Sequence, residues 1–570
     1  MIKKNRIVPF PLYGLLPALC CLLKGWSDRL YTDIDSFLFS VTCAGLYGTD
    51  IDCPVIHPVL KVVLSILSRL WPNADWFSVL SHIFVVLGIW WLGTLLTLYI
   101  PHQSKRLACL FVLCFALLQF SFFNLNYTVY AGLFSFLGVS SLLLSLRSTS
   151  PTCVGVFSAL FLCLGFLWRK EGAILFLPFL FLDFCVLLIF RKTSWAKLWR
   201  RFAICVLPAA AVLLCSILFY VSTPARQAEN LYYNSRSALV DYPRKPWDEV
   251  SDILTEHGIS ENDYNTASAS IFLDTDLVTA DFLHQVSSVS QARSFVSSPF
   301  HFLQELVSLA GTFSTTLLRI LGFFALALFL IVWLSRTSLI DKIEVLLAAS
   351  GALIICLYYQ YLGRLPERVI ACVLLALLSI ILPLFLVAPQ CTNKFQDRFW
   401  QVICVAAGCA IGICLWENRY SYRILQPALL AGHSTNQATA KLTDSENEDT
   451  VYLWQSTTLA LYMTEHYMSQ GKLPDENFLR HNLPWGEWNT SGQTGYQQFL
   501  TSLEMENPMQ SLLTRPNTYL VGNDTSLIQT WLREHYNAQA VVQSIGAVDV
   551  FALDEVPVWQ AIVEPANTVS

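Results

Sequence analysis

Two adjoining stretches near the start of the chain decide the fold class: "IVPFPLYGLLPALCCLL", residues 7–23, and "RLYTDIDSF", residues 29–37. The first is an apolar run close to the roughly 20 residues that a helix needs to cross a membrane. The second places two carboxylates, Asp33 and Asp35, shortly after that run. This pattern predicts a membrane-spanning helix with ionisable groups held at the membrane surface.

The rest of the chain repeats the apolar pattern. Of its 570 residues 54% are hydrophobic and only 14% are charged, which is too apolar for an ordinary soluble protein of this length. We predict eleven spans, at residues 7–23, 77–99, 107–122, 128–146, 152–167, 173–190, 202–221, 315–335, 343–359, 369–388 and 400–416. The first follows Lys3, Lys4 and Arg6 without a convincing cleavage site, so we expect an uncleaved helix. No basic domain or aromatic–basic stripe suggests a nucleic-acid partner.

The distribution of Lys and Arg predicts the orientation. Under an eleven-span arrangement the basic short loops all fall on one side; they hold Lys105, Arg106, Arg147, Arg191, Lys192, Lys197, Arg200, Arg201, Arg336, Lys342, Lys394 and Arg398. Basic residues accumulate in cytoplasmic loops, so we expect a cytoplasmic N-terminus and an exported C-terminus. The expected location is a bacterial cytoplasmic membrane.

The spacing of the spans predicts two parts. Residues 1–416 form a mainly α, polytopic helical bundle with exported loops at 24–76 and 222–314, and residues 417–570 form a small exported α/β domain. In the first loop we expect two amphipathic stretches, 36–47 and 55–70. In the tail "TYLVGN" reads as a strand, "SLIQTWLREHYN" as a helix and "AVVQSIGAVDVFAL" as a β-hairpin.

The acids after the first span are the leading candidates for catalysis. On an extended segment Asp33 and Asp35 point the same way, so their carboxylates could share a metal or a proton. On a helix they diverge, and one would act while the other orients. They could equally be ordinary solvated charges. The second "TDID", residues 49–52, lies between Gly48 and Pro54 and reads as a turn.

Basic residues on the outward side need another reason to be there. Arg169 and Lys170 flank the predicted second carboxylate, Glu171, and Arg364 and Arg368 would share one face if their segment is helical. Guanidinium groups at a membrane surface suit a phosphate or pyrophosphate. The plainer alternatives are side chains that reach toward lipid headgroups and a salt-bridged helix start.

Three further residues are weaker candidates for substrate contacts. His57 in "CPVIHPVLKVVL" precedes Pro58 and is expected to start a helix, where a structural role competes with a substrate contact. Tyr232 and Arg236 lie in the long second loop, where they could face a sugar.

Together, "YTDIDSF" after the first span, the stretches 36–47 and 55–70, and the tail from residue 417 resemble the GT-C superfamily of integral-membrane glycosyltransferases. The resemblance implies transfer of a sugar from a polyprenyl-phosphate carrier to a glycan, lipid or protein acceptor on the outer face, with an acid as general base or metal ligand. That role falls on Asp33 or Asp35. Family members often have adjacent acids, whereas Ile34 separates them here.

Two other functions compete with transfer. A transporter or flippase of lipid-linked sugars would need charges deep in the spans or broken helices. A non-enzymatic envelope-assembly protein would depend on its tail rather than on its loop acids. The sequence leaves the cofactor open, with a divalent cation such as Mg²⁺ or Mn²⁺ one possibility, and no Cys/His cluster has zinc spacing.

Overall fold

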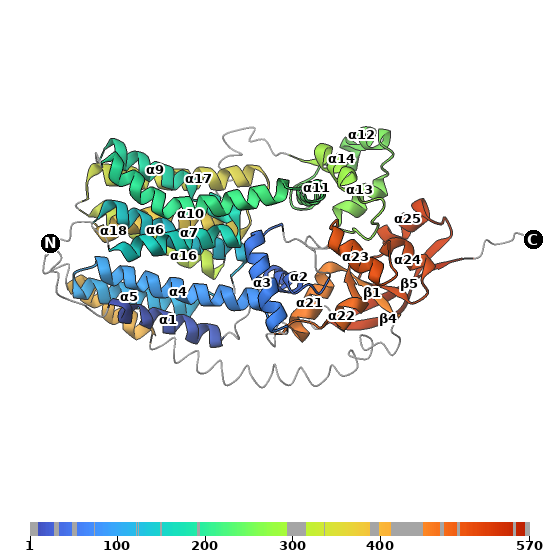
Figure 1. The fold of residues 1–570 in the computed structure, drawn as a ribbon, viewed down its shortest axis with the longest axis horizontal. Coiled ribbons are helices and arrows are strands. Elements are labelled where there is room, and N and C mark those ends of the chain that lie inside the picture. Colours follow the sequence, from blue (N-terminus) through green and yellow to red (C-terminus); the bar gives the residue numbers. More distant parts are fainter. Residues whose placement is uncertain are drawn as a thin grey trace, which may run out of the picture.

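The computed structural model of the protein divides into a helical bundle and a polar end that we call the head (Figure 1). It describes residues 10–27, 34–47, 54–72, 74–120, 122–123, 125–148, 151–190, 194–292, 315–335, 337–387, 398–411, 449–467, 472–486, 491–550 and 554–564. The protein is mainly helical, with 72% helix and a small C-terminal sheet. Asp33, Asp50 and Asp52 lie outside the described residues.

The bundle helices overlap the apolar stretches predicted as spans, but the predicted number of eleven spans is not confirmed. They are α1 (Phe10–Ser27), α4 (Trp76–Tyr99), α5 (Gln103–Gln119), α6 (Tyr127–Arg147), α7 (Thr152–Trp168), α8 (Lys170–Ile174), α9 (Leu177–Ile189), α10 (Trp195–Val221), α16 (Thr316–Leu334), α17 (Leu339–Tyr361), α18 (Glu367–Val387) and a helix at Arg398–Ile411. Among the described residues, six helical stretches are long and apolar enough to cross a membrane, namely α4, α6, Lys170–Ile189, Leu198–Val221, α16 and α18. Both α6 and α18 are mostly buried, so they form the centre of the bundle.

Small residues let the central helices approach closely. A Cβ on Gly138 of α6 would lie 2.7 Å from Leu162 of α7, and one on Gly165 of α7 would lie 2.3 Å from the Ser135 hydroxyl of α6. Close contact of this kind is how helices associate in lipid, where burial of apolar surface provides little attraction between them.

The head is built from helices and one mixed sheet. Its helices are α11 (Pro224–Val240), η1 (Trp247–Glu249), α12 (Ser251–Glu256), α13 (Glu261–Ser268), α14 (Ala280–Ser290), α21 (Ser456–His466), α22 (Glu476–His481), α23 (Thr494–Ser502), α24 (Pro508–Thr514) and α25 (Ser526–His535). The strands β1 (Val451–Trp454), β2 (Asn482–Pro484), β3 (Thr518–Val521), β4 (Ala540–Val550) and β5 (Asp554–Val563) have the order β2-β1-β3-β5-β4. The β1–β2 and β1–β3 pairs are parallel, and β5 is antiparallel to β3 and β4.

The tail contains the predicted strand and helix as β3 and α25, but the predicted hairpin is wrong. Residues 540–550 form one long strand, β4, whose antiparallel partner is the later strand β5. Gly546 follows a shift in register at Ser544 instead of forming a turn. A glycine inside a strand commonly marks such an irregularity.

The hydrophobic core of the head combines three segments that are distant in sequence. It contains Phe37 and Tyr47 from the first loop, Phe272 from the second, and Trp454 and Trp531 from the tail. Asp274 helps to join the last two segments, because its buried carboxylate accepts hydrogen bonds from Asn507 (2.9 Å), Trp531 (2.8 Å) and Tyr536 (2.7 Å). The tail and the second loop therefore fold against each other.

The two stretches expected to be amphipathic behave differently. The second forms α3 (Pro58–Leu70), which buries Leu60 and Leu64 and exposes an apolar face made of Val59, Val62, Val63, Ile66 and Leu70. The first forms α2 (Ile34–Cys43), which is buried from Ser36 to Cys43. The amphipathic prediction for residues 36–47 is wrong, because one face of α2 packs on the bundle and the other on the head.

A charged cluster lies inside the bundle at the end remote from the head. Arg147, which we predicted in a short loop, ends α6 and is buried, and it pairs with Asp183 of α9 and Glu344 of α17. Asp341 lies 3.9 Å away. The ion pairs give Arg147 a structural reason for its position that is independent of membrane orientation.

Asp75 attaches α4 to α2, which gives a stability prediction. Its buried carboxylate caps α4 by accepting from the Ser78 backbone N–H (3.0 Å), and it also accepts from the Ser40 hydroxyl of α2. Asp75→Ala leaves these donors unpaired and should lower the free energy of unfolding by about 1–3 kcal/mol. Asp75→Asn keeps a capping oxygen and should lose less. Thermal unfolding of the purified protein measures both, and equal losses would contradict the capping role.

Candidate functional site

A group of charged and aromatic side chains gathers where the bundle meets the head. Asp35 stands in the first turn of α2, and its surroundings come from three other places in the chain. Burial raises the pKa of the Asp35 carboxyl, the charges of Arg368, Arg169 and Arg236 lower it, and the Asp241 carboxylate raises it. Segments separated by up to about 330 residues thus place one acid among three guanidinium groups. We use the name cationic cluster for the three arginines Arg169, Arg236 and Arg368 together with Asp35 and Asp241.

Arg169 is presented by a break between two helices. α7 ends at Trp168, Arg169 itself is extended (φ −163°, ψ 115°), and α8 begins at Lys170. Its guanidinium donates to the Thr128 hydroxyl (3.0 Å) and lies 4.8 Å from the centre of the Tyr127 ring. The first turn of α6 therefore fixes the direction of this cation.

Glu171 and Lys170 lie beside Arg169. A Glu171 carboxylate oxygen is 3.4 Å from Arg169 Nε, and the other is 3.8 Å from Lys170 Nζ. Half of the Glu171 side chain is exposed, so it can reach solvent or a ligand. Lys170 also lies 5.4 Å from the centre of the Tyr220 ring on α10.

The helix α11 contributes Arg236 and ends at a second carboxylate, Asp241. Arg236 Nε is buried and has no hydrogen-bond partner among the described residues. Asp241 accepts a hydrogen bond from Ser237 (2.6 Å) and pairs with Arg364 at 2.9 Å. We did not single out Asp241 from the sequence; its one local signal is an acid immediately after a polar helical stretch.

Arg364 and Arg368 do not share a helix face, because the segment that joins them is not one helix. Arg364 lies in the turn between α17 and α18, whereas Arg368 stands in the first turn of α18. Arg364 faces Asp241 and the Tyr242 ring, at 4.9 Å from its centre. Of these two arginines, only Arg368 acts directly on Asp35.

His57 and Tyr232, two of the residues predicted to contact a substrate, make contacts that support the fold. His57 caps α3: its Nδ1 accepts from the Val59 backbone N–H (3.1 Å), and Nε2 donates to the Val212 carbonyl (2.7 Å). Tyr232 is buried in the head core against Gly492 and Phe272. The neighbouring residue Tyr233 interacts with the Arg169 guanidinium, whose charge lowers the pKa of Tyr233. Burial has the larger effect and raises that pKa. Successive helix residues point about 100° apart, which separates the two roles.

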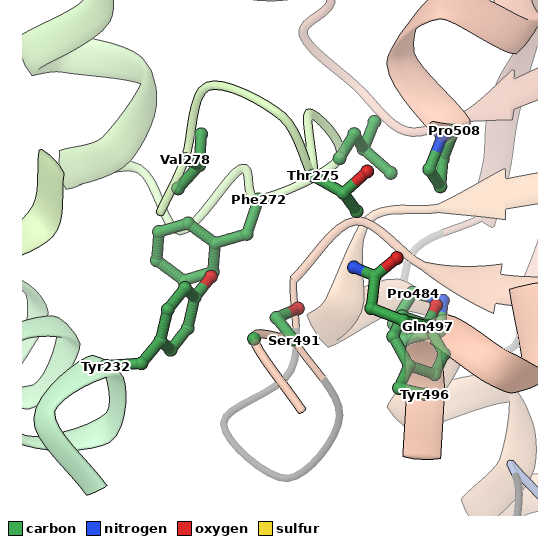
Figure 2. A pocket seen from close by; sticks show the side chains of 11 residues that line it. Tyr232, Phe272, Thr275, Val278, Pro484, Ser491, Tyr496, Gln497 and Pro508 are labelled. Carbon is green, nitrogen blue, oxygen red and sulfur yellow. The ribbon is translucent and has the colours of Figure 1, made fainter. Parts of the chain in front are cut away.

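Two small pockets lie near these residues. One is lined by Tyr220, Glu229, Asn230, Tyr233 and Gln493, among others, and two of these rings, Tyr220 and Tyr233, interact with Lys170 and Arg169 respectively. The other lies at the seam between the second loop and the tail, where Tyr232, Thr275, Ser491 and Gln497 surround it (Figure 2). The first has a volume of about 10 Å³, which is room for no more than one water molecule.

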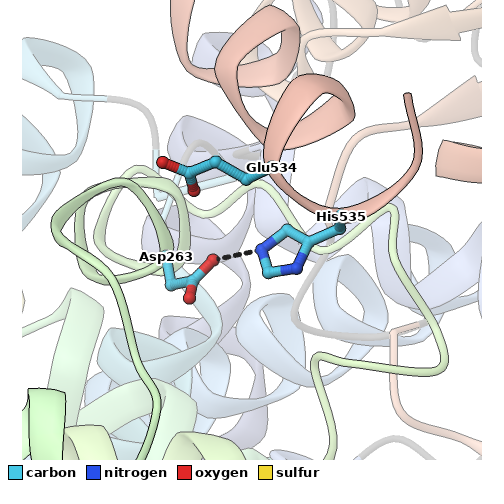
Figure 3. A group of neighbouring side chains, drawn as sticks. All are labelled: Asp263, Glu534 and His535. Carbon is cyan, nitrogen blue, oxygen red and sulfur yellow. Dashed lines mark hydrogen bonds and ion pairs between the residues drawn. The ribbon is translucent and has the colours of Figure 1, made fainter. Parts of the chain in front are cut away.

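One group of side chains in the head has the composition of a metal site. Potential ligand atoms of Asp263, Glu534 and His535 lie within 4.8 Å of one another (Figure 3). Each already has a protein partner: Asp263 accepts from the Ser260 backbone N–H (2.9 Å) and contacts His535 Nε2 (2.7 Å), and Glu534 accepts from the Ser260 hydroxyl (2.9 Å). These contacts join α13 to α25, and we interpret them as structural.

No protein-family model matches the chain, and no curated protein or solved structure matches it. These comparisons therefore assign no function to the chain.

The turn that carries Arg364 gives a prediction about glycine. Gly363 has φ +69°, and a Cβ there would lie 2.3 Å from Pro243 Cγ. Gly363→Ala should lower stability by about 1–3 kcal/mol, because the backbone is strained and the side chain clashes. The matched control is Gly351→Ala within α17, where a Cβ meets open space and should be neutral or stabilising by up to about 1 kcal/mol. Thermal unfolding compares the two; equal effects would contradict the tight turn.

Proposed function

We propose that the protein is a membrane glycosyltransferase of the GT-C type, which moves a sugar from a polyprenyl-phosphate carrier to an acceptor hydroxyl on the side of the membrane where the head lies. The observation that carries the proposal is the convergence of Asp35 with Arg169, Arg236 and Arg368 at the end of the bundle that meets the head. A lipid-linked substrate would bring its phosphate to this level of the membrane. We also propose that this side is outside the cytoplasm.

The residues divide into two chemical roles. The acceptor oxygen attacks the anomeric carbon, its proton passes to Asp35, and the bond between the sugar and the lipid phosphate breaks. The electron pair of that bond leaves with the phosphate, whose negative charge the guanidinium groups of Arg169, Arg236 and Arg368 stabilise. Positive charge that develops on the sugar ring favours a nearby carboxylate, which is the role we give to Glu171.

The surroundings of Asp35 suit a general base. A carboxylate acts best as a base when its pKa approaches the working pH, and burial moves the Asp35 pKa in that direction. Asp33, outside the described residues, remains the alternative base.

Neutralising the candidate base should abolish transfer. With labelled polyprenyl-phosphate sugars and membranes containing the protein, Asp35→Asn should lower the transfer rate by at least about 100-fold, the usual worth of a positioned base. Asp252→Asn, an exposed acid of α12, is the matched control and should retain activity.

The same assay separates the alternatives. Normal transfer by Asp35→Asn at normal expression would contradict our assignment. Loss of transfer in Asp33→Asn alone would assign the general base to Asp33. A flippase would show labelled lipid crossing the membrane without any transferred sugar.

The pH profile of transfer tests the electrostatic arrangement. Transfer needs Asp35 deprotonated, so the rate should fall as the pH decreases through its pKa, which burial has raised. Arg368→Gln removes a positive charge that lowers this pKa, so the acidic limb should move to higher pH. Lys170→Gln, which removes a cation that does not act on Asp35, should leave the limb in place. A limb that stays fixed in Arg368→Gln would show that another group titrates.

A further inference from the structure

An apolar cavity of about 410 Å³ lies within the bundle, and none of the charged residues proposed above for catalysis lines it. Its walls come from α4, α5, α6, α16, α18 and the helix at 398–411, and they include Ala108, Ala116, Leu375 and Trp400. The volume is in the range of pockets that hold small organic molecules. Its lining side chains are aliphatic, aromatic or thiol, so the cavity suits an apolar occupant such as a hydrocarbon chain.

The length of the cavity matches one leaflet of a bilayer. On α18 the lining runs from Leu375 to Phe385, about 15 Å at the rise of an α-helix. That is half of a hydrocarbon core of roughly 30 Å. Thr315, just before α16, donates a hydrogen bond to Glu367 at the start of α18, so both helices begin at the end of the bundle that meets the head. The α18 lining therefore lies toward the remote end, whereas the α16 lining begins at Ile320, about one turn from the head end.

The cavity has an edge at the surface of the bundle. Phe323 of α16 lines it and is 65% exposed. An acyl chain can therefore enter sideways from the surrounding lipid without passing through the head.

A cation marks the end of the cavity that is remote from the head. Lys105, near the start of α5, is half-buried, and its ammonium lies 4.0 Å from the centre of the Phe385 ring and 5.7 Å from that of Trp400. Both rings line the cavity. In the described part of the chain, Lys105 contacts these rings and pairs with no carboxylate. A chain that fills the cavity would place a headgroup phosphate beside this ammonium.

We propose that the cavity binds one acyl chain of an anionic phospholipid from the leaflet remote from the head, with the lipid phosphate paired to Lys105. This lipid is distinct from the sugar donor, whose phosphate would lie at the opposite end of the bundle. It fills a gap between the central helices α6 and α18 and the outer helices α5 and α16, and so supports the bundle from that side.

Lipid retention by the purified full-length protein tests the proposal. The protein in mild detergent is incubated with equal amounts of phosphatidylglycerol and phosphatidylcholine, and bound lipid is counted by native mass spectrometry. The native chain should retain at least about 5-fold more phosphatidylglycerol, which corresponds to about 1 kcal/mol. Lys105→Gln should remove this preference.

Lys342→Gln is the matched control. Lys342 also lies near a tryptophan ring, 6.0 Å from the centre of Trp333, yet neither residue lines the cavity. This variant should keep the native preference. Ala116→Phe, which fills the cavity, should reduce the retention of both lipids.

Three results would overturn the proposal. They are equal retention of the two lipids by the native chain, an unchanged preference in Lys105→Gln, and displacement of phosphatidylglycerol by a long-chain polyprenyl phosphate in a Lys105-dependent manner. The last result would assign the cavity to an isoprenoid carrier. None of these measurements uses transfer activity, so their outcome does not depend on whether the proposed function is correct.

Discussion

The packing of α2 between two hydrophobic cores is the constraint on which the rest of the structure depends. Phe39 packs into the bundle against Phe77 and Tyr127, with ring centres 5.1 and 4.8 Å apart. On the other side Tyr47, just after the helix, meets Tyr496 and Phe499 of the tail at 6.2 and 6.1 Å. A helix buried on both faces cannot rotate without exposing apolar surface to water. Asp35 at its first turn is therefore held in one place.

The same contacts connect the acid to the cations around it. Tyr127, on which Phe39 packs, also carries the Arg169 guanidinium on its ring. Near Asp35 burial and opposite charge compete, and burial wins, since the pKa is raised despite three arginines. A carboxyl whose pKa is raised in this way accepts a proton more readily than an exposed carboxyl does. Arg364 affects Asp35 indirectly. It pairs with Asp241, whose negative charge raises the pKa of Asp35.

Several basic residues that suggested the membrane orientation also have structural partners. Arg147 is buried with Asp183 and Glu344, and a buried ion pair that loses one partner typically costs about 3–5 kcal/mol. Lys105 lies over aromatic rings at the edge of the apolar cavity. Loop charge and internal packing therefore place cations at the same end of the bundle, and sequence counting cannot separate the two causes.

The sequence by itself determined the elements whose signals are local. Apolar runs lie on helices, "TYLVGN" and "SLIQTWLREHYN" became β3 and α25, and the acids after the first apolar run and the later arginines were predicted to converge on one site. Length, composition and periodicity are carried by consecutive residues, which is why they can be read without a fold.

Only the tertiary structure decided how these parts meet. It buried α2 on both faces, separated the roles of Tyr232 and Tyr233, placed Arg364 on Asp241, and paired β4 with β5. Each of these outcomes depends on a surface supplied by residues far away in the chain. An apolar side chain packs equally well against lipid, a second helix or another domain. The distant surface therefore decides whether one face of a helix is exposed or buried.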